Sequence, residues 1–187
     1  FSVNNMISFR KISEDDLPLI LRWRTDPEVT RHMSTDIEYD LEKQTNWYNQ
    51  VVCNRSPAEH WIISHNEKPV GVINLEKYDS TLQQTSWGYY IGEMESRIIG
   101  GLIPAYFYNY MFFNRDSSLK KINGHLFSEN TKVLAMHRFY GVKEVKILKN
   151  NIHKYGKKFD LILIEMTREK WILQRENFQH YQANFEE

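Results

Sequence analysis

Residues 85–102 read TSWGYYIGEMESRIIGGL, and this stretch decides the fold. Its first part, residues 85–91, is rich in aromatic side chains and predicts a β-strand. Arg97 and two adjacent glycines then precede an apolar run, which predicts a loop over residues 92–101 followed by a helix. N–H groups at a helix start lack partners and, with the helix dipole, attract anions. The stretch therefore predicts a strand, a turn and an anion site, although an ordinary glycine turn fits the same letters.

Gly88 and Gly92 interrupt the aromatic strand itself. Glycines in a strand often mark a bulge or the close approach of another main chain. A bulged strand can pair with an amide-bearing ligand and direct one N–H at a carbonyl oxygen of that ligand. An aromatic strand within the hydrophobic core is the alternative interpretation.

Alternating apolar and turn patterns extend outward from this segment in both directions. Further strands are predicted at residues 7–12, 61–64, 70–75, 121–127, 142–148 and 159–166, and helices at 13–25, 41–52, 102–113 and 130–140. This order predicts an α/β fold with a mixed sheet of about seven strands and helices on both faces. We expect one domain over residues 6–175 and a charged, helical or frayed tail over residues 176–187.

Composition narrows the function classes. Hydrophobic residues make up 41% of the 187, which is too many for a disordered chain, and 24 basic residues balance 24 acidic ones. That balance gives no reason to expect nucleic acid or an anionic membrane as partner. The single cysteine, Cys53, and the absence of close histidine pairs argue against disulfides and metal, so we expect a metal-free cytoplasmic protein.

A third segment, NTKVLAMHRFYGV at residues 130–142, predicts a helix that Gly141 ends. Asn130 stands where an N-cap is expected. His137 lies two turns further along the same face. It is a candidate proton donor, and a packed or surface histidine is the alternative.

Element order and these segments resemble the GNAT superfamily of N-acetyltransferases from Ile7 to about Trp171. The pyrophosphate signature of that family is Arg or Gln, two residues, Gly, one residue, then Gly or Ala. Arg97 and Gly100 keep this pattern, while Leu102 departs from it. The resemblance implies a mainly antiparallel sheet and acetyl-CoA as co-substrate. The residues that it places at the cofactor are Tyr89, Tyr90, Ile91, Arg97, Ile99, Gly100, Gly101, Leu102 and Asn130.

A narrower resemblance points to the flagellin-sugar branch of the superfamily, whose members acetylate a UDP-linked 4-amino-4,6-dideoxy sugar in pseudaminic acid synthesis. It rests on short matches in order at residues 23–33, 61–63, 68–75, 87–93, 154–160 and 168–171. By this resemblance Arg24, Met33 and Trp47 line the nucleotide-sugar site. Asn74 and Trp87 approach the sugar.

The reaction implied is direct attack of the sugar amine on acetyl-CoA within a ternary complex. A base must take the amine proton, and His125 is our candidate because the ordinary histidine pKa lies near 6.5. His137 would protonate or hydrogen-bond the departing thiolate. A backbone N–H of the strand at residues 89–91 would stabilise the oxyanion.

Two alternatives remain open on the sequence. One is a protein N-terminal or polyamine N-acetyltransferase of the same fold. The other is a module that binds CoA without catalysis, which the altered loop at Ile98 and Leu102 suggests. The oligomeric state is also open, a homodimer included.

Overall fold

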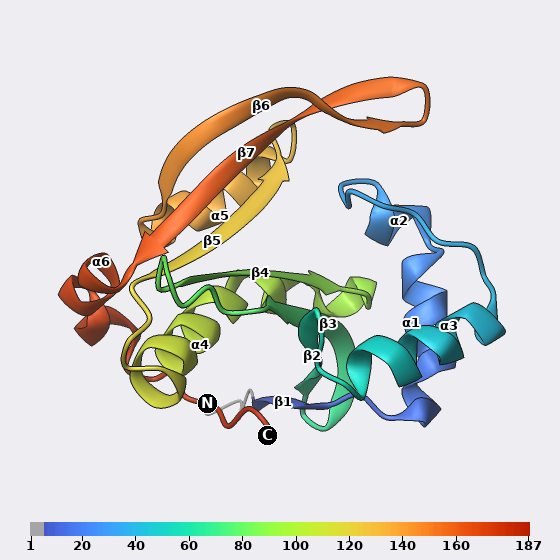
Figure 1. Cartoon of the computed structure of the whole chain (residues 1–187), viewed down its shortest axis with the longest axis horizontal. Helices are drawn as coiled ribbons and strands as arrows, with labels where there is room; N and C mark the ends of the chain where they lie inside the picture. The colour runs from blue at the N-terminus through green and yellow to red at the C-terminus, as the bar shows by residue number, and fades with distance from the viewer. Residues whose placement is uncertain (1–5) are drawn as a thin grey trace.

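The chain, described over residues 6–187 by a computed structural model, folds around one seven-stranded sheet (Figure 1). The strands are β1 (Ile7–Lys11), β2 (Ala58–His65), β3 (Lys68–Glu76), β4 (Gln84–Ile91), β5 (Lys121–Phe127), β6 (Lys143–Lys154) and β7 (Lys157–Thr167). They lie in the order β1-β2-β3-β4-β5-β7-β6, and only β4 and β5 run parallel. The predicted mixed, mainly antiparallel sheet of about seven strands is confirmed.

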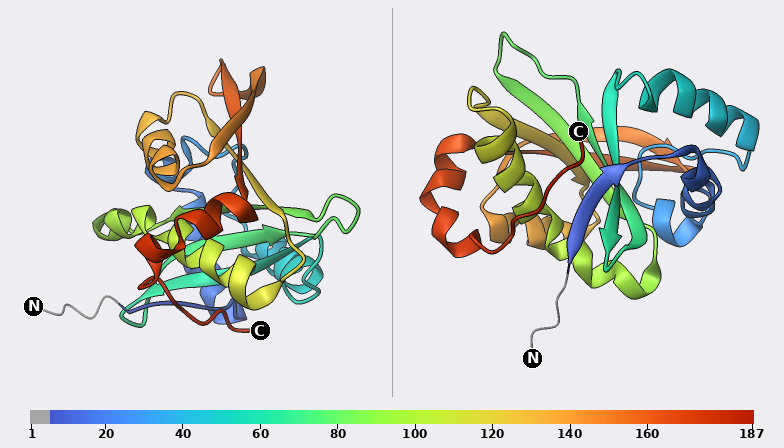
Figure 2. Two further views of the ribbon diagram at one scale, coloured as in Figure 1. Left: turned by 90° about the vertical axis from the view of Figure 1, so that its left-hand side faces the viewer. Right: turned by 90° about the horizontal axis from the view of Figure 1, so that it is seen from below.

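Helices cover both faces of the sheet, as predicted (Figure 2). The α-helices are α1 (Leu17–Arg24), α2 (Pro27–Thr30), α3 (Leu41–Trp47), α4 (Ile103–Asn109), α5 (Thr131–Tyr140) and α6 (Arg168–Leu173). Short 3-10 or π turns are η1 (Glu14–Asp16), η2 (Tyr48–Val52), η3 (Met94–Gly101), η4 (Tyr110–Arg115) and η5 (Arg175–Phe178). No helix within residues 6–187 is long and apolar enough to cross a membrane.

The two faces are distinguished by what packs on them. On one face, α1 packs Ile20 and Trp23 against Ile62 and Val72. On the other face, α4 lies over β4, and α5 packs Leu134 against β5 and β7. We call the first the α1 face and the second the α4 face.

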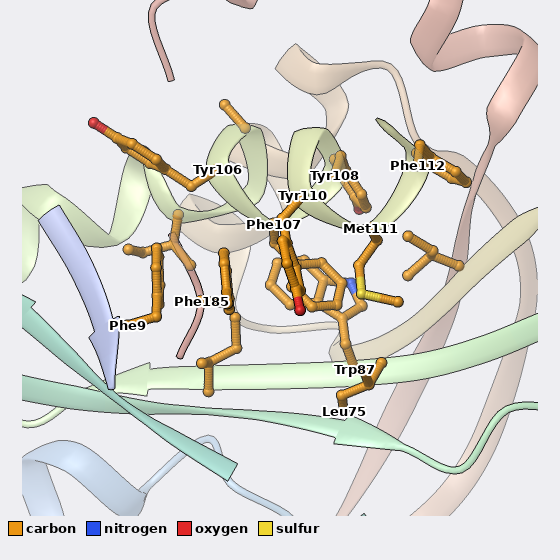
Figure 3. Packing of buried hydrophobic residues seen from close by; sticks show 14 of the residues in the cluster. Phe9, Leu75, Trp87, Tyr106, Phe107, Tyr108, Tyr110, Met111, Phe112 and Phe185 are labelled. Carbon is orange, nitrogen blue, oxygen red and sulfur yellow. The ribbon is translucent and has the colours of Figure 1, made fainter. Parts of the chain in front are cut away.

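Stacked aromatic rings form the core between α4 and the sheet (Figure 3). Trp87 stacks on Phe107 of α4 with ring centroids 4.2 Å apart. Phe185 stacks on Phe9 at 3.9 Å and on Tyr110 at 4.1 Å. Each such ring contributes roughly 1.5–3 kcal/mol through burial. This core supports β4 from the α4 face.

The last residues of the chain belong to that core. Phe185 is 4% exposed and forms a parallel bridge with Phe9. The Glu186 N–H donates to the Phe9 carbonyl at 2.9 Å, and the Trp61 indole donates to the Glu186 carbonyl at 2.8 Å. The expectation of a helical or frayed tail is therefore wrong at its end, because one buried phenylalanine outweighs the polar residues around it.

Candidate active site

Strands β4 and β5 pair over only three residues before they diverge (Figure 1). The pairs join residues 84–86 to residues 121–123. Beyond them, residues 87–91 of β4 pair with β3, and the described chain places no strand on their other edge. Main-chain N–H and C=O groups alternate along that free edge. An extended ligand that carries amide groups can pair with it as an added strand would.

Residues after β4 differ from the sequence expectation. The predicted loop over residues 92–101 is wrong, because most of it winds into the 3-10 helix η3. Such turns are frequent at the start of α-helices. The Leu102 N–H is used within this helix, donating to the Ile99 carbonyl at 2.9 Å. The segment predicted to bind an anion is thus a 3-10 helix and not an irregular glycine loop.

Two tyrosines hold the glycine pair of η3. The Tyr89 hydroxyl donates to the Gly100 carbonyl at 2.6 Å, and the Tyr140 hydroxyl donates to the Gly101 carbonyl. A Cβ at Gly101 would meet no atom within 4 Å, so a ligand can approach its main chain closely. Leu102 packs against the core beneath α4, which directs its side chain inward. The residue that departs from the family signature therefore lies away from the open side of Gly101.

Arg97 links this segment to the α1 face. Its guanidinium donates a 2.6 Å hydrogen bond to the Glu28 carbonyl of α2, and the side chain is exposed. A guanidinium carries five N–H donors, so others remain for an anion. Ile99 is buried at 5% exposure and anchors the segment in the core, whereas Ile98 is 87% exposed.

Asn130 and His137 lie at the start and in the last turn of α5. Asn130 occupies the N-cap position, but its side chain makes no capping bond. His137 is buried, and its Nδ1 has no hydrogen-bond partner. Burial lowers the pKa of His137 to about 4, so the imidazole is neutral at neutral pH. A neutral imidazole still donates one hydrogen bond.

A row of polar positions crosses three strands on the α1 face. His60, Asn74 and Gly88 are successive register partners on β2, β3 and β4. A Cβ at Gly88 would lie 3.1 Å from the Asn74 Oδ1, so the glycine leaves room for the Asn74 amide to extend over β4. Trp47 of α3 meets the His60 ring edge-on at 5.1 Å. The predicted residues Asn74 and Trp47 are thus joined through His60, which the sequence analysis missed.

Arg24 and Met33 meet at the end of α1. The Arg24 guanidinium reaches the Met33 sulfur at 3.9 Å and the Thr35 carbonyl at 3.1 Å. Its Nε is buried and has no partner. Tyr90 of β4 lies close enough to feel the Arg24 charge, but burial dominates and raises the Tyr90 pKa. Arg24 therefore places a positive charge on the α1 face, and its Nε–H makes no hydrogen bond.

Trp87 lies in the core between β4 and α4. Strand alternation places it opposite to Gly88, on the α4 face. It is 6% exposed and stacked on Phe107. Trp87 and Asn74 therefore lie on opposite faces of the sheet, although both are expected to approach the sugar.

Beyond the point of divergence, β5 turns polar groups to the α1 face. Leu126 packs under α5, so the preceding His125 points to the opposite side, where it is exposed. Asn123 shares this side with its β7 partner Glu165. The Glu165 carboxylate is 12% exposed and pairs with Lys121 at 3.1 Å. His125 and His137 thus lie on opposite faces of the sheet.

Residues 7–143 match the protein family described as acetyltransferase (GNAT) domain. The chain belongs to the GNAT acetyltransferases. It is an acetyl-CoA-dependent N-acetyltransferase, and the free edge of β4 and the glycine pair of η3 suit the co-substrate that this family uses. No curated protein matches the chain in sequence.

Solved structures of similar fold include spermidine N-acetyltransferase from Vibrio cholerae in complex with CoA and spermine. It superposes with a TM-score of 0.79 at 15% identity, over 89% of this chain and 98% of that one. A chimera of the Vibrio cholerae enzyme with hSSAT gives a TM-score of 0.77 at 15% identity, with 89% and 98% covered. At this identity the likeness supports the GNAT fold and leaves the acceptor open.

Two residues of the candidate site were not predicted from the sequence. His60 lies in a strand whose pattern reads as core, and Glu165 lies in the last strand, far from every motif. Side chains alternate along a strand, so the pairing of β5 with β7 is enough to place Glu165 on the same face as Asn123. The sequence does not show this pairing. Within residues 6–187, no three His, Cys, Asp or Glu side chains gather as a metal site would require.

Proposed function

We propose that the acceptor is the 4-amino group of a UDP-linked amino-deoxy sugar. The observation that carries this proposal is Arg24, whose buried Nε has no partner on the α1 face. Diphosphate and uracil oxygens accept hydrogen bonds from a guanidinium, and Arg24 is only partly buried, so an anionic ligand can reach it. A polycation would instead be repelled by it.

Two carboxylates near this face already have lysine partners. Asp36 pairs with Lys154 at 2.8 Å, and Glu165 pairs with Lys121 at 3.1 Å. A spermidine-like acceptor needs free carboxylates, so these pairings favour the anionic acceptor.

Apolar contacts for the sugar nucleotide come from Met33 and Trp47. Met33 lies against the Arg24 guanidinium, and Trp47 is partly buried beside His60. An aromatic ring and a thioether provide flat, polarisable contacts for a base or a sugar. Asn74 extends over Gly88 and is suited to a sugar hydroxyl or to the amine.

For acetyl-CoA, we propose that residues 89–91 pair with the pantetheine arm through the free edge of β4 and direct one N–H at the thioester oxygen. Arg97, Gly100 and Gly101 would hold the pyrophosphate. Ile99 and Leu102 support this segment from the core, and the uncapped Asn130 amide faces the same ligand. This assignment rests on the family resemblance and on the open side of Gly101.

In the reaction, the amine nitrogen bonds to the acetyl carbon while the carbon–sulfur bond breaks. His125, exposed on the α1 face, accepts the amine proton, and Glu165 on the same face is the alternative base. His137 on the α4 face is neutral and donates a hydrogen bond to the thiolate. A base and a donor on opposite faces match an amine that attacks from one side of the sheet and a thiolate that leaves on the other.

A polyamine N-acetyltransferase is the second candidate, since a similar fold binds spermine. Titration calorimetry with UDP and CoA present separates the two. We expect UDP to bind, and Arg24→Gln to weaken it about 10- to 100-fold through loss of charge-assisted hydrogen bonds. Arg22→Gln, an exposed arginine of the same helix, is the matched control. Absence of UDP binding to the unmodified chain would refute the nucleotide-sugar proposal.

A further inference from the structure

Lys154, the last residue of β6, is buried with its side chain 6% exposed. Its Nζ donates to the main-chain carbonyls of Thr30 and Met33, each at 2.8 Å. It also pairs with the Asp36 carboxylate at 2.8 Å. An ammonium has three N–H donors, so all of them are used. These partners are more than a hundred residues away in the chain, which makes Lys154 a long-range clamp.

The hairpin of β6 and β7 brings Lys154 close to Thr30 and Met33. It projects away from the body of the sheet above α2 (Figure 1). Phe159 of β7 stacks on Phe127 at 5.0 Å and anchors the hairpin close to its turn. The chain then reverses at Tyr155 and Gly156, both with positive φ. The hairpin thereby holds Lys154 in place against residues 30–36.

Residues 31–36 form no helix or strand, so tethers from outside determine their course. Arg24 donates to the Thr35 carbonyl from the α1 side. His32 contacts Glu129 at 3.4 Å and meets the Phe127 ring edge-on. Within residues 6–187, Lys154 is the only side chain that bonds to main-chain carbonyls on both sides of Arg31.

We infer that Lys154 is a positioning residue for the acceptor site. It fixes residues 30–36, which carry Met33 against Arg24, in the conformation that the acceptor meets. The inference rests on the proposed acceptor site, and it adds a part of the chain that lies beyond the family match at residues 7–143. Without the ammonium, two carbonyls and a carboxylate lose their shared donor, and the segment opens.

Limited trypsin digestion tests the clamp without any acceptor. Arg31 is exposed, so opening of the segment permits cleavage after it. We expect Lys154→Met to be cut after Arg31 at least about tenfold faster than the unmodified chain, as mass spectrometry of the released fragments shows. Lys157→Met removes an exposed lysine of the same hairpin and should be cut at the original rate. Equal rates for Lys154→Met and Lys157→Met would overturn the clamp.

Kinetics test the positioning role with whichever amine the chain acetylates best. We expect Lys154→Met to raise the acceptor KM about tenfold or more, with the acetyl-CoA KM within about twofold. Lys154→Arg, which keeps the charge, should recover part of this loss. Asp36→Asn, which leaves Lys154 in place, should shift the acceptor KM in the same direction by less. Parallel rises of both KM values would overturn the inference. Failure of a UDP-sugar as substrate would instead refute the proposed acceptor, and the trypsin result would stand.

Discussion

The Tyr89 hydroxyl donates a 2.6 Å hydrogen bond to the carbonyl oxygen of Gly100 and also contacts the Met136 sulfur at 3.2 Å. This side chain joins three parts of the proposed acetyl-CoA site: strand β4, helix η3 and helix α5. Burial raises the pKa of Tyr89, so its hydroxyl keeps its proton and acts as a permanent donor. The strand that would meet the thioester is therefore tied to the glycines that would meet the pyrophosphate.

Tyr89→Phe should raise the Kd for acetyl-CoA about three- to tenfold, since it leaves the Gly100 carbonyl without its donor at a cost of about 1 kcal/mol. Titration calorimetry measures the change. Tyr78→Phe is a suitable control, because its hydroxyl contacts Ser118 in an exposed region. An unaltered Kd in Tyr89→Phe would show that this bond does not shape the cofactor site.

Arg97→Ala should weaken CoA binding about tenfold, because the guanidinium at the start of the glycine segment is lost. The loss should shrink at high salt, since the exposed charge is screened there. Arg138→Ala removes an exposed arginine of α5 that pairs with Glu144 and serves as control. If Arg97→Ala bound CoA as tightly as the unmodified chain, the pyrophosphate assignment would fail.

His137→Phe should lower kcat about 10- to 100-fold and leave the acetyl-CoA Kd nearly intact, because an aromatic ring still fills the position while the thiolate loses its donor. Steady-state kinetics with calorimetry separate the two quantities. A variant with the original kcat would remove His137 from the mechanism.

Acid should destabilise the fold through its buried histidines. Burial lowers the pKa of both His60 and His137 from 6.5 to about 4. In the unfolded chain both imidazoles take up a proton at a higher pH than in the folded chain. The free energy of unfolding is therefore at its full value above pH 6.5 and falls as the pH drops toward 4. The loss is on the order of 3 kcal/mol for each histidine. Urea unfolding at pH 7 and pH 4 should show a smaller loss for His137→Phe than for the exposed-site control His180→Gln. Equal losses would contradict the burial argument.

The strands could be predicted because their signals are local, whereas the burial of Phe185 near the end of the chain depends on distant residues. The strands at 61–64, 70–75 and 85–91 have apolar periodicity and turn residues at their ends, which are local signals. Phe185 carries no such signal, because its partners Phe9 and Trp61 are more than a hundred residues away. Its burial follows only from the assembled fold.

The candidate site also contains residues with local sequence signals and residues whose positions depend on distant contacts. Arg97, Gly100 and Asn130 lie in segments with recognisable turn or cap chemistry, so their neighbourhood could be predicted. Trp87 faces away from Asn74 because Asn74 pairs with Gly88, and the sequence does not reveal this register. Lys154 depends on a hairpin that reaches across the molecule, and no local pattern marks such a contact.

Whether the acceptor is an anionic nucleotide sugar or a polycation is the central question, and one measurement addresses it most directly. It is the ratio of kcat/KM for a UDP-linked 4-amino-4,6-dideoxy sugar to kcat/KM for spermidine, both followed by release of free CoA thiol. We predict a ratio above about 100, because the Arg24 cation attracts the first acceptor and repels the second. A ratio below one would contradict the account and assign the chain to polyamine acetylation.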